Sequence, residues 1–362
     1  MKRLFTFKTC LLFLALSMLT LACKKDSTPT PLVLPVARNY TTVSTFVGSN
    51  TAEAGSIDGT GLAARFNATG GMAQDDQGNL FVADIANHTI RKVSATGVVT
   101  TFAGSAGVSG NANGIGSAAR FNSPYGLTID AQNNIYVAEY RGHTIRKITS
   151  AGVVTTVAGN GISGSTNGIG ASANFNQPIG IALDNAGNLF VGEFGNSLIR
   201  KIVLSTGIVS TFASGVGNIG GICIDAQNNL YLASGTDVKK ISATGTVTSV
   251  AGSATEGGVV NGQGTTARFN EAFGICRDAA GNLYVNARSS GAIRKISADG
   301  LVSDFAGLTE ALLIGGTRPK LVGDEDGALT TARFRSLSQL YINTSGIIYV
   351  SEEGGNRIRT IQ

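Results

Sequence analysis

Short runs of apolar and β-branched residues alternate with polar turns along most of the chain, at the spacing expected of β-strands. One stretch shows the pattern clearly and predicts strands at residues 125–130, 135–139, 144–149 and 153–158. Asp, Asn and Gly fill the turns between them, where left-handed or self-bonded backbone is needed. The pattern therefore predicts a repeating unit of four antiparallel strands.

Three marks show that this unit recurs along the chain. The basic position of the "IRK" segment recurs at Arg91, Arg146, Arg200, Lys239, Arg294 and Arg359. The Phe of the "ARFN" segment lies 25 residues before five of them, at Phe66, Phe121, Phe175, Phe269 and Phe334. The "TFAG" position recurs at Phe46, Phe102, Val157, Phe212, Val250 and Phe305. Six four-stranded units of this kind predict an all-β fold, a six-bladed β-propeller.

The two ends of the chain each hold half a unit. The segment "TTVSTFVG", residues 41–48, has the character of a last strand but no unit precedes it. The final unit ends at "NRIRTIQ" and lacks that last strand. A ring in which the N-terminal strand completes the last blade would leave no unpaired blade edge, so we expect the propeller to close in this way.

Two segments carry a family resemblance. "GGMAQDDQGNLFVADIANHTIRKV" and "PYGLTIDAQNNIYVAEYRGHTIRKI" resemble the NHL-repeat family of propellers, and the likeness covers residues 40–362. The resemblance implies the propeller fold. It says little about function, because NHL propellers include enzymes, RNA binders, sensors and adhesion modules.

The first residues are typical of a targeting segment. Lys2 and Arg3 precede the apolar run "CLLFLALSMLTLA", and "LTLAC" resembles a bacterial lipoprotein signal whose Cys23 is acylated; a plain secretory signal is the alternative. Residues 1–22 are then a signal peptide, and residues 23–39, with half of the prolines, are a semi-rigid tether to the propeller of residues 40–362. We expect export and anchoring in the cell envelope, at the outer membrane or cell surface.

The charge balance bears on the partner. The formal net charge is +5, and three of the basic residues, Lys2, Arg3 and Lys8, belong to the signal segment. Without these three the net charge of the mature chain is +5 − 3 = +2. A net charge this small is not typical of a protein that binds nucleic acid.

The connections between strands indicate which face carries a site. With the four strands of a unit named A, B, C and D in chain order, the turns that join A to B and C to D are tight, whereas the connections from D to the next A vary in length. The D-to-A and B-to-C connections share one face, so we expect the binding face there.

Carboxylates recur at the end of strand B on this face, at Asp84, Glu139, Glu193 and Glu352. Ser234 and Ala287 replace them in blades four and five. Each acid precedes an "IRK" arginine by seven residues, and a hairpin centred between them would place Asp84 opposite Arg91. Two interpretations stay open: a cross-strand ion pair that stabilises the hairpin, or acids lining a channel mouth for a cation or polar ligand.

Other repeated residues have structural interpretations. We expect the "ARFN" Phe to wedge between blades. His88 and His143 occupy one slot in neighbouring blades and form part of the candidate binding face; two histidines cannot build a three-His zinc site. A carboxylate and Asn site for a metal stays open, although no metal, cofactor or catalytic residue is assigned. Cys223 and Cys276 hold equivalent strand positions, and we expect free buried thiols.

The connectors break the symmetry of the ring. The one at residues 307–333 is about ten residues longer than its peers and carries "ALLIGG", whereas the connector before blade four is nearly absent. An asymmetric groove is what selects one ligand. We therefore expect binding to depend on residues 312–320, from Leu312 to Lys320.

These observations predict a monomeric, lipid-anchored envelope protein whose propeller is a binding or scaffold module for a protein or carbohydrate partner. The alternative is an enzyme, a metal-assisted hydrolase or lactonase-like propeller that uses the acids of the D–A and B–C face.

Overall fold

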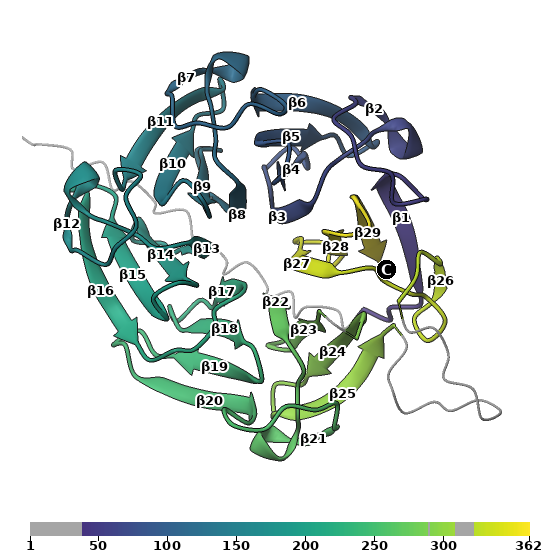
Figure 1. Cartoon of the computed structure of the whole chain (residues 1–362). Coiled ribbons are helices and arrows are strands. Elements are labelled where there is room, and N and C mark those ends of the chain that lie inside the picture. The colour runs from purple at the N-terminus through teal and green to yellow at the C-terminus, as the bar shows by residue number, and fades with distance from the viewer. Residues whose placement is uncertain (1–37, 289, 308–321) are drawn as a thin grey trace, which may run out of the picture. The chain divides into compact units, whose positions relative to one another are not determined.

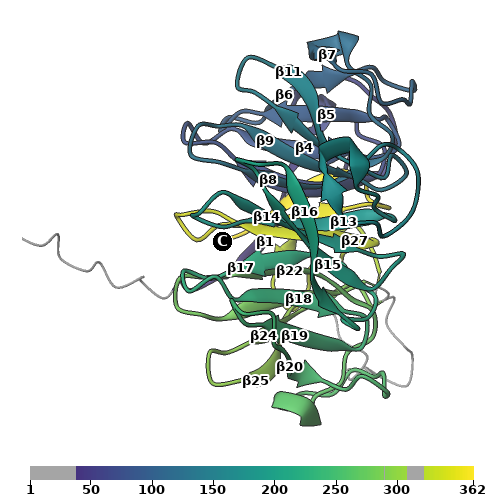
Figure 2. The ribbon, with the colours of Figure 1, turned by 90° about the vertical axis from the view of Figure 1, so that its left-hand side faces the viewer.

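The sheets of this protein follow one another around a central axis, as Figure 1 shows. The computed structural model describes residues 38–288, 290–307 and 322–362, and within these ranges there are six antiparallel sheets. Each sheet is one blade, which confirms the six-bladed propeller. In the side view of Figure 2 the strand ends gather at two opposite faces. Among the described residues, no helix has the length and apolar character needed to cross a membrane.

Each blade contains strands A, B, C and D, counted outward from the axis. The A strands are β3 (Thr69–Gln74), β8 (Pro124–Ile129), β13 (Pro178–Leu183), β17 (Ile222–Ile224), β22 (Ala272–Arg277) and β27 (Leu337–Ile342). The B strands are β4 (Leu80–Asp84), β9 (Ile135–Glu139), β14 (Asn188–Glu193), β18 (Leu230–Ser234), β23 (Leu283–Ala287) and β28 (Ile348–Glu352). The C strands are β5 (Thr89–Val93), β10 (Thr144–Ile148), β15 (Leu198–Val203), β19 (Asp237–Ile241), β24 (Ala292–Ile296) and β29 (Arg357–Ile361). The D strands are β6 (Val98–Gly104), β11 (Val153–Ala158), β16 (Ile208–Ser214), β20 (Val247–Gly252), β25 (Leu301–Ala306) and β1 (Thr42–Gly48).

The ring closes through the N-terminal strand, as predicted. Strand β1 pairs antiparallel with β29, with Val43 opposite Ile361 and Gly48 opposite Arg357. Val43 and Val47 are buried. Figure 1 shows the purple strand β1 beside the yellow strands of the last blade. The sixth blade is thus assembled from both ends of the described chain.

A fifth strand on the outer edge of most blades was not predicted. These strands are β2 (Gly59–Thr60), β7 (Gly114–Ile115), β12 (Gly168–Ile169), β21 (Gly262–Gln263) and β26 (Gly327–Ala328). In the described residues blade four has no such strand, in keeping with its short connector. Two residues are too few to show the alternation that marks a strand in a sequence, which is why the prediction of four strands was incomplete.

The outer strands show how the connectors run. The five connectors that contain an outer strand pass from a D strand to the outer edge of the next blade before they return to the axis. For example, β2 follows strand D of blade six in the chain but pairs with β6, strand D of blade one. Single-turn 3-10 helices follow four of the outer strands: η1 (Gly61–Ala63), η2 (Gly116–Ala118), η3 (Gly170–Ser172) and η4 (Gly264–Thr266). The "ARFN" segment then leads inward to strand A.

The "ARFN" phenylalanines lie between blades, as expected. Phe121 is fully buried and packs in one cluster with Ala83 of blade one and Val137 of blade two. Phe269 likewise packs with residues of blades four and five. These rings therefore join neighbouring blades and hold the returning connector.

The innermost strands approach one another so closely that glycine is needed there. A Cβ at Gly126 would lie 2.1 Å from the backbone oxygen of Ile179 in the next blade, and one at Gly71 would lie 2.6 Å from that of Tyr125. No side chain fits at such distances. The tight inner ring positions the A strands, and with them the residues of the site described below.

The two described cysteines are free, with Cys276 buried and Cys223 half-buried. They pack in different inter-blade clusters, Cys276 with Phe334 and Cys223 with Phe269. Burial raises the pKa of the Cys223 thiol to about 12 and that of Cys276 well above its ordinary value. Both thiols are therefore protonated at neutral pH.

Candidate ligand-binding site

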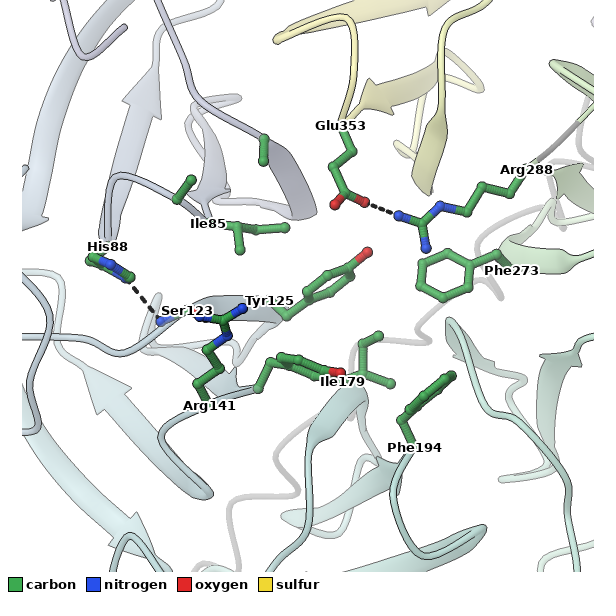
Figure 3. Close-up of a pocket in the computed structure, with 13 residues that line it drawn as sticks. Ile85, His88, Ser123, Tyr125, Arg141, Ile179, Phe194, Phe273, Arg288 and Glu353 are labelled. Atoms are coloured by element: carbon green, nitrogen blue, oxygen red, sulfur yellow. Dashed lines mark hydrogen bonds and ion pairs between the residues drawn. The ribbon is translucent and has the colours of Figure 1, made fainter. Parts of the chain in front are cut away.

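A cavity of about 510 Å³ opens at the axis on the D–A and B–C face. We call it the axial cup, and Figure 3 shows it in close-up. Its lining comprises Ala68, Ile85, Ala86, His88, Ser123, Tyr125, Tyr140, Arg141, Ile179, Phe194, Phe273, Arg288 and Glu353. These residues come from the start of strand A and from the turn after strand B, in blades one, two, three, five and six.

The floor of the axial cup consists of Tyr125, Ile179 and Phe273, which pack in one buried cluster. The Tyr125 and Phe273 rings meet edge to face, with their centroids 6.0 Å apart. The Tyr125 hydroxyl reaches across the axis and shares a 2.9 Å hydrogen bond with the Ser338 hydroxyl of blade six. Burial raises the pKa of Tyr125 well above its ordinary value, so the phenol stays neutral. This floor separates the axial cup from a cavity of about 330 Å³ lined by the inner strands.

Aromatic rings continue from the floor up one wall. Tyr140 is 6.4 Å from Tyr125, and Phe194 is 6.5 Å from Tyr140, measured between ring centroids. The four rings, from Phe194 to Phe273, form a continuous chain through blades three, two and five. The side chain of Phe194 is 37% exposed. Tyr140 is half-buried, so these two rings of the wall stay partly accessible from the cup, whereas Tyr125 and Phe273 are buried beneath them.

Charged groups stand on opposite sides of the cup (Figure 3). Arg288 of blade five forms an ion pair with Glu353 of blade six, and its guanidinium lies 4.8 Å from the centre of the Phe273 ring. Both side chains of the pair are about one-third exposed. Arg141 extends into the cup from the side of blade two. Two cations and one anion therefore border an apolar floor.

His88 lines the cup, and its protonation follows from one contact. Its Nδ1 accepts a 3.1 Å hydrogen bond from the backbone N–H of Ser123, so the neutral ring carries its proton on Nε2. Burial, with a contribution from the charge of Arg141, lowers the pKa of His88 below its ordinary value. His88 is therefore a neutral hydrogen-bond donor at pH 7.

His143 repeats the backbone contact of His88 but lies outside the cup lining. Its Nδ1 accepts from the backbone N–H of Gln177, at 3.1 Å. In blade six Asn356 takes the same place, and its Oδ1 accepts from the N–H of Ala68 at 2.8 Å. This slot ties the end of one blade to the start of the next, which favours a structural role for the histidines.

The four predicted acids do not line the cup. Asp84, Glu139, Glu193 and Glu352 are all fully buried. Asp84 Oδ2 accepts from Arg91 and Asn87, both at 2.8 Å, and its Oδ1 accepts from the backbone N–H of Asn67 at 2.7 Å. Burial raises the pKa of Asp84 to about 6, against the hydrogen bonds from Asn87 and Asn67 and the charge of Arg91. Both of its oxygens are engaged, so this geometry favours the ion-pair interpretation over the channel mouth.

The strand register corrects the prediction that Asp84 lies opposite Arg91. Asp84 lies opposite Thr89 and Arg91 lies opposite Val82, so the ion pair runs diagonally between the strands. The other three acids form the same ion pair. The equivalent pairs join Glu139 to Arg146, Glu193 to Arg200, and Glu352 to Arg359, each at 3.2 Å.

Each of these arginines also anchors a connector. Arg146 donates to the backbone oxygens of Arg120 and Ala112 and to Asn113 Oδ1, at 3.0, 3.2 and 2.8 Å. Its guanidinium lies 5.4 Å from the centre of the Phe121 ring. The "ARFN" and "NG" segments of the repeat thus converge on one buried cation. Their recurrence is architectural, as expected.

The sequence left a metal site open and placed the dependence of binding in the long connector. Within the described ranges, no group of three or more His, Cys, Asp and Glu side chains could hold a metal ion. Residues 312–320, with Leu312 and Lys320, lie outside the described residues.

Comparison with known proteins decides the family. No family model matches the chain. The chain is 30% identical to NHL repeat-containing protein 2 of Bos taurus over 292 residues, which cover 78% of this chain and 36% of that protein. A match of this length takes in most of residues 40–362, which form the propeller that carries the NHL-like segments. The chain belongs to the NHL-repeat family.

Several solved structures have the same fold as this NHL propeller. A structural genomics protein of unknown function from Bacteroides thetaiotaomicron superimposes with a TM-score of 0.71 at 22% identity, covering 89% of this chain and 75% of that one. An auxiliary nutrient binding protein from the same organism superimposes with a TM-score of 0.68 at 15% identity, covering 90% and 77%. The NHL chain spans about a third of the length of the curated relatives that it matches.

The sequence pattern of this NHL propeller predicts the repeated residue at the end of strand B as a candidate for the site, whereas the cup is lined by the residue that follows it. Ile85, Tyr140, Phe194, Arg288 and Glu353 each directly follow the last residue of strand B, where the repeated acid or its replacement stands. The repeated residue is buried at the end of the strand, whereas the residue after it begins the turn and lines the cup. The signal was available as variation, because this position changes from blade to blade while the position before it is mostly acidic.

Proposed function

We propose that this NHL propeller is a binding module and that the axial cup holds a carbohydrate. The observation that carries the proposal is the chain of four aromatic rings with charged groups at its border. Apolar ring faces can stack on the C–H faces of a sugar, while the ions and His88 supply donors and acceptors for its hydroxyls. The auxiliary nutrient binding protein of similar fold supports a binding role in the same general sense.

We expect the ring faces of Tyr140 and Phe194 to be needed for binding. Replacing either with Leu keeps an apolar side chain but removes the flat surface, so affinity should fall about tenfold, or roughly 1.4 kcal/mol. A panel of neutral and acidic oligosaccharides would be screened against the full chain, and each hit measured by titration calorimetry.

The matched control is Phe102→Leu, since Phe102 packs against Phe81 away from the cup. It should leave affinity unchanged. If no oligosaccharide binds, and a peptide or protein partner binds instead, the carbohydrate assignment is wrong.

We also propose that the chain is a lipid-anchored envelope protein, with Cys23 as the acylated residue. The support is the sequence "LTLAC" after a basic start and an apolar run. Residue 23 lies outside the described residues, so the proposal rests on the sequence.

Labelled palmitate should enter the wild-type protein in a bacterial host but not Cys23→Ser, because only the thiol of that residue would accept the lipid. Cys10→Ser is the control and should still be labelled, since Cys10 belongs to the signal segment. Equal labelling of wild type and Cys23→Ser would rule out the anchor.

A further inference from the structure

Arg141 stands apart from the buried arginines that recur in the repeat. Arg91, Arg146, Arg200, Arg294 and Arg359 are fully buried and recur at one position of the repeat. Arg141 is exposed, and its place in blades one, three and six is taken by Ala86, Gly195 and Gly354. The repeat therefore does not need an arginine there, and the architecture gives no reason for its charge.

Arg141 also lacks a partner. Within the part of the chain that the structure describes, no hydrogen bond or ion pair reaches its guanidinium, and its backbone oxygen alone accepts a bond, from Asn122. The other cation of the cup, Arg288, is paired with Glu353. The described lining of the axial cup thus holds one cation more than its single carboxylate can balance.

The position of this unpaired cation is defined by its neighbours. Arg141 directly follows Tyr140, whose ring belongs to the aromatic chain, and Figure 3 shows its side chain among those that line the cup, which also include Tyr125 and Ser123. On the same side, His88 has its Nδ1 occupied by Ser123 and keeps Nε2–H as a donor. Both donors share the cup lining with Tyr140, so a ligand that fills the cup meets them together with that ring.

We propose that the axial cup selects acidic sugars and that Arg141 binds their carboxylate. This rests on the proposed carbohydrate-binding function of the same site. A guanidinium is planar and donates two parallel hydrogen bonds to a carboxylate, which gives both charge and direction. A uronic acid has both a sugar ring, which can stack on the aromatic side chains, and a carboxylate, which can pair with Arg141. Arg288 keeps its own carboxylate, Glu353, and so serves the neutral part of the ligand.

The test compares one sugar in two charge states. The full chain would be titrated with oligogalacturonate and with its methyl ester, which keeps the ring and removes the anion. The wild type should bind the acid at least tenfold more tightly than the ester, and added salt should narrow the difference. Arg141→Gln should bind both forms alike, with an affinity for the ester close to that of the wild type.

The control is Arg120→Gln, which removes one positive charge from a residue that donates to the backbone oxygens of Ser117 and Ala119, outside the cup lining. It should keep the preference for the acid. Equal binding of both forms by the wild type, or a preference that survives in Arg141→Gln, would overturn the inference and leave the carbohydrate function standing. Failure of every carbohydrate to bind would overturn both.

Discussion

A chain that begins at Ser49 should fail to form a monomeric propeller. Its last blade would end at β29, and the hydrogen bonds from Val43 to Gly48 along that strand would be lost. An unpaired strand of this kind is a template for association with other chains. We expect aggregates or swapped oligomers, measured by size-exclusion chromatography with light scattering, and no cooperative melting at the wild-type temperature.

The expected size of the effect follows from burial. Val43 and Val47 are 1% and 0% exposed, and burying two such side chains contributes about 3–6 kcal/mol. Tyr40 would be lost as well, together with its edge contacts to Tyr284 and Phe305. The free energy of unfolding of a whole domain is only roughly 5–15 kcal/mol, so removal of this strand would cost a large part of it.

Relocation of the strand is the matched control. Placing "NYTTVSTFVGS" after Gln362, through the turn "SATG" used elsewhere in the chain, restores the same pairing from the other side. This permuted chain should be monomeric and should melt cooperatively. If the shortened chain without it is already a stable monomer, the ring closes by some other contact.

Arg146→Met should destabilise the protein by about 3–5 kcal/mol, the usual cost of removing one partner of a buried ion pair. The variant keeps the apolar stem but leaves Glu139 buried without its cation. The oxygens of Arg120, Ala112 and Asn113 lose their donor at the same time. Urea denaturation followed by circular dichroism would give the change in the free energy of unfolding.

Blade five provides the comparison, because Ala287 stands where the acid would be. Arg294 donates to Asn261 and to two backbone oxygens, and its nearest carboxylate, that of Asp304, lies 3.7 Å from Nε. Burial lowers the pKa of Arg294, with an opposing contribution from Asp304. Arg294→Met leaves no buried carboxylate without its cation, so it should cost about 1–3 kcal/mol, for the hydrogen bonds that the guanidinium donates to uncharged oxygens. Equal losses in the two variants would show that the buried carboxylate adds nothing to the role of the arginine.

The contrast between these two blades separates architecture from function. The acid and arginine recur in blades one, two, three and six because each of these blades must anchor a connector and pack against the next. The axial cup, in contrast, is built from positions that differ between blades, such as Tyr140, Arg288 and Glu353. In a repeat protein of this kind, a ligand is selected where the repeat varies.

The sequence by itself determined the fold, the number of blades and the closure of the ring. Strand alternation and turn residues are local signals, and they were repeated often enough that an error in one blade was corrected by the others. The half-units at the two ends left one way to pair β1 (Thr42–Gly48) with β29 (Arg357–Ile361). The wedge of Phe121 between blades followed from the same regularity.

Only the tertiary structure decided which side chains meet at the axis. Tyr125 bonds to Ser338, 213 positions away, and Arg288 pairs with Glu353, 65 positions away. No local pattern encodes such contacts, because they depend on how closely the inner strands of different blades converge. In the closed ring, Asp84 and its equivalents pair with buried arginines. The residues that follow them in the sequence line the cavity at the axis. Asp84 ends strand B and Ile85 begins the turn after it; only the closed ring brings such turns together at the axis, and so decides that the turn residue faces a ligand.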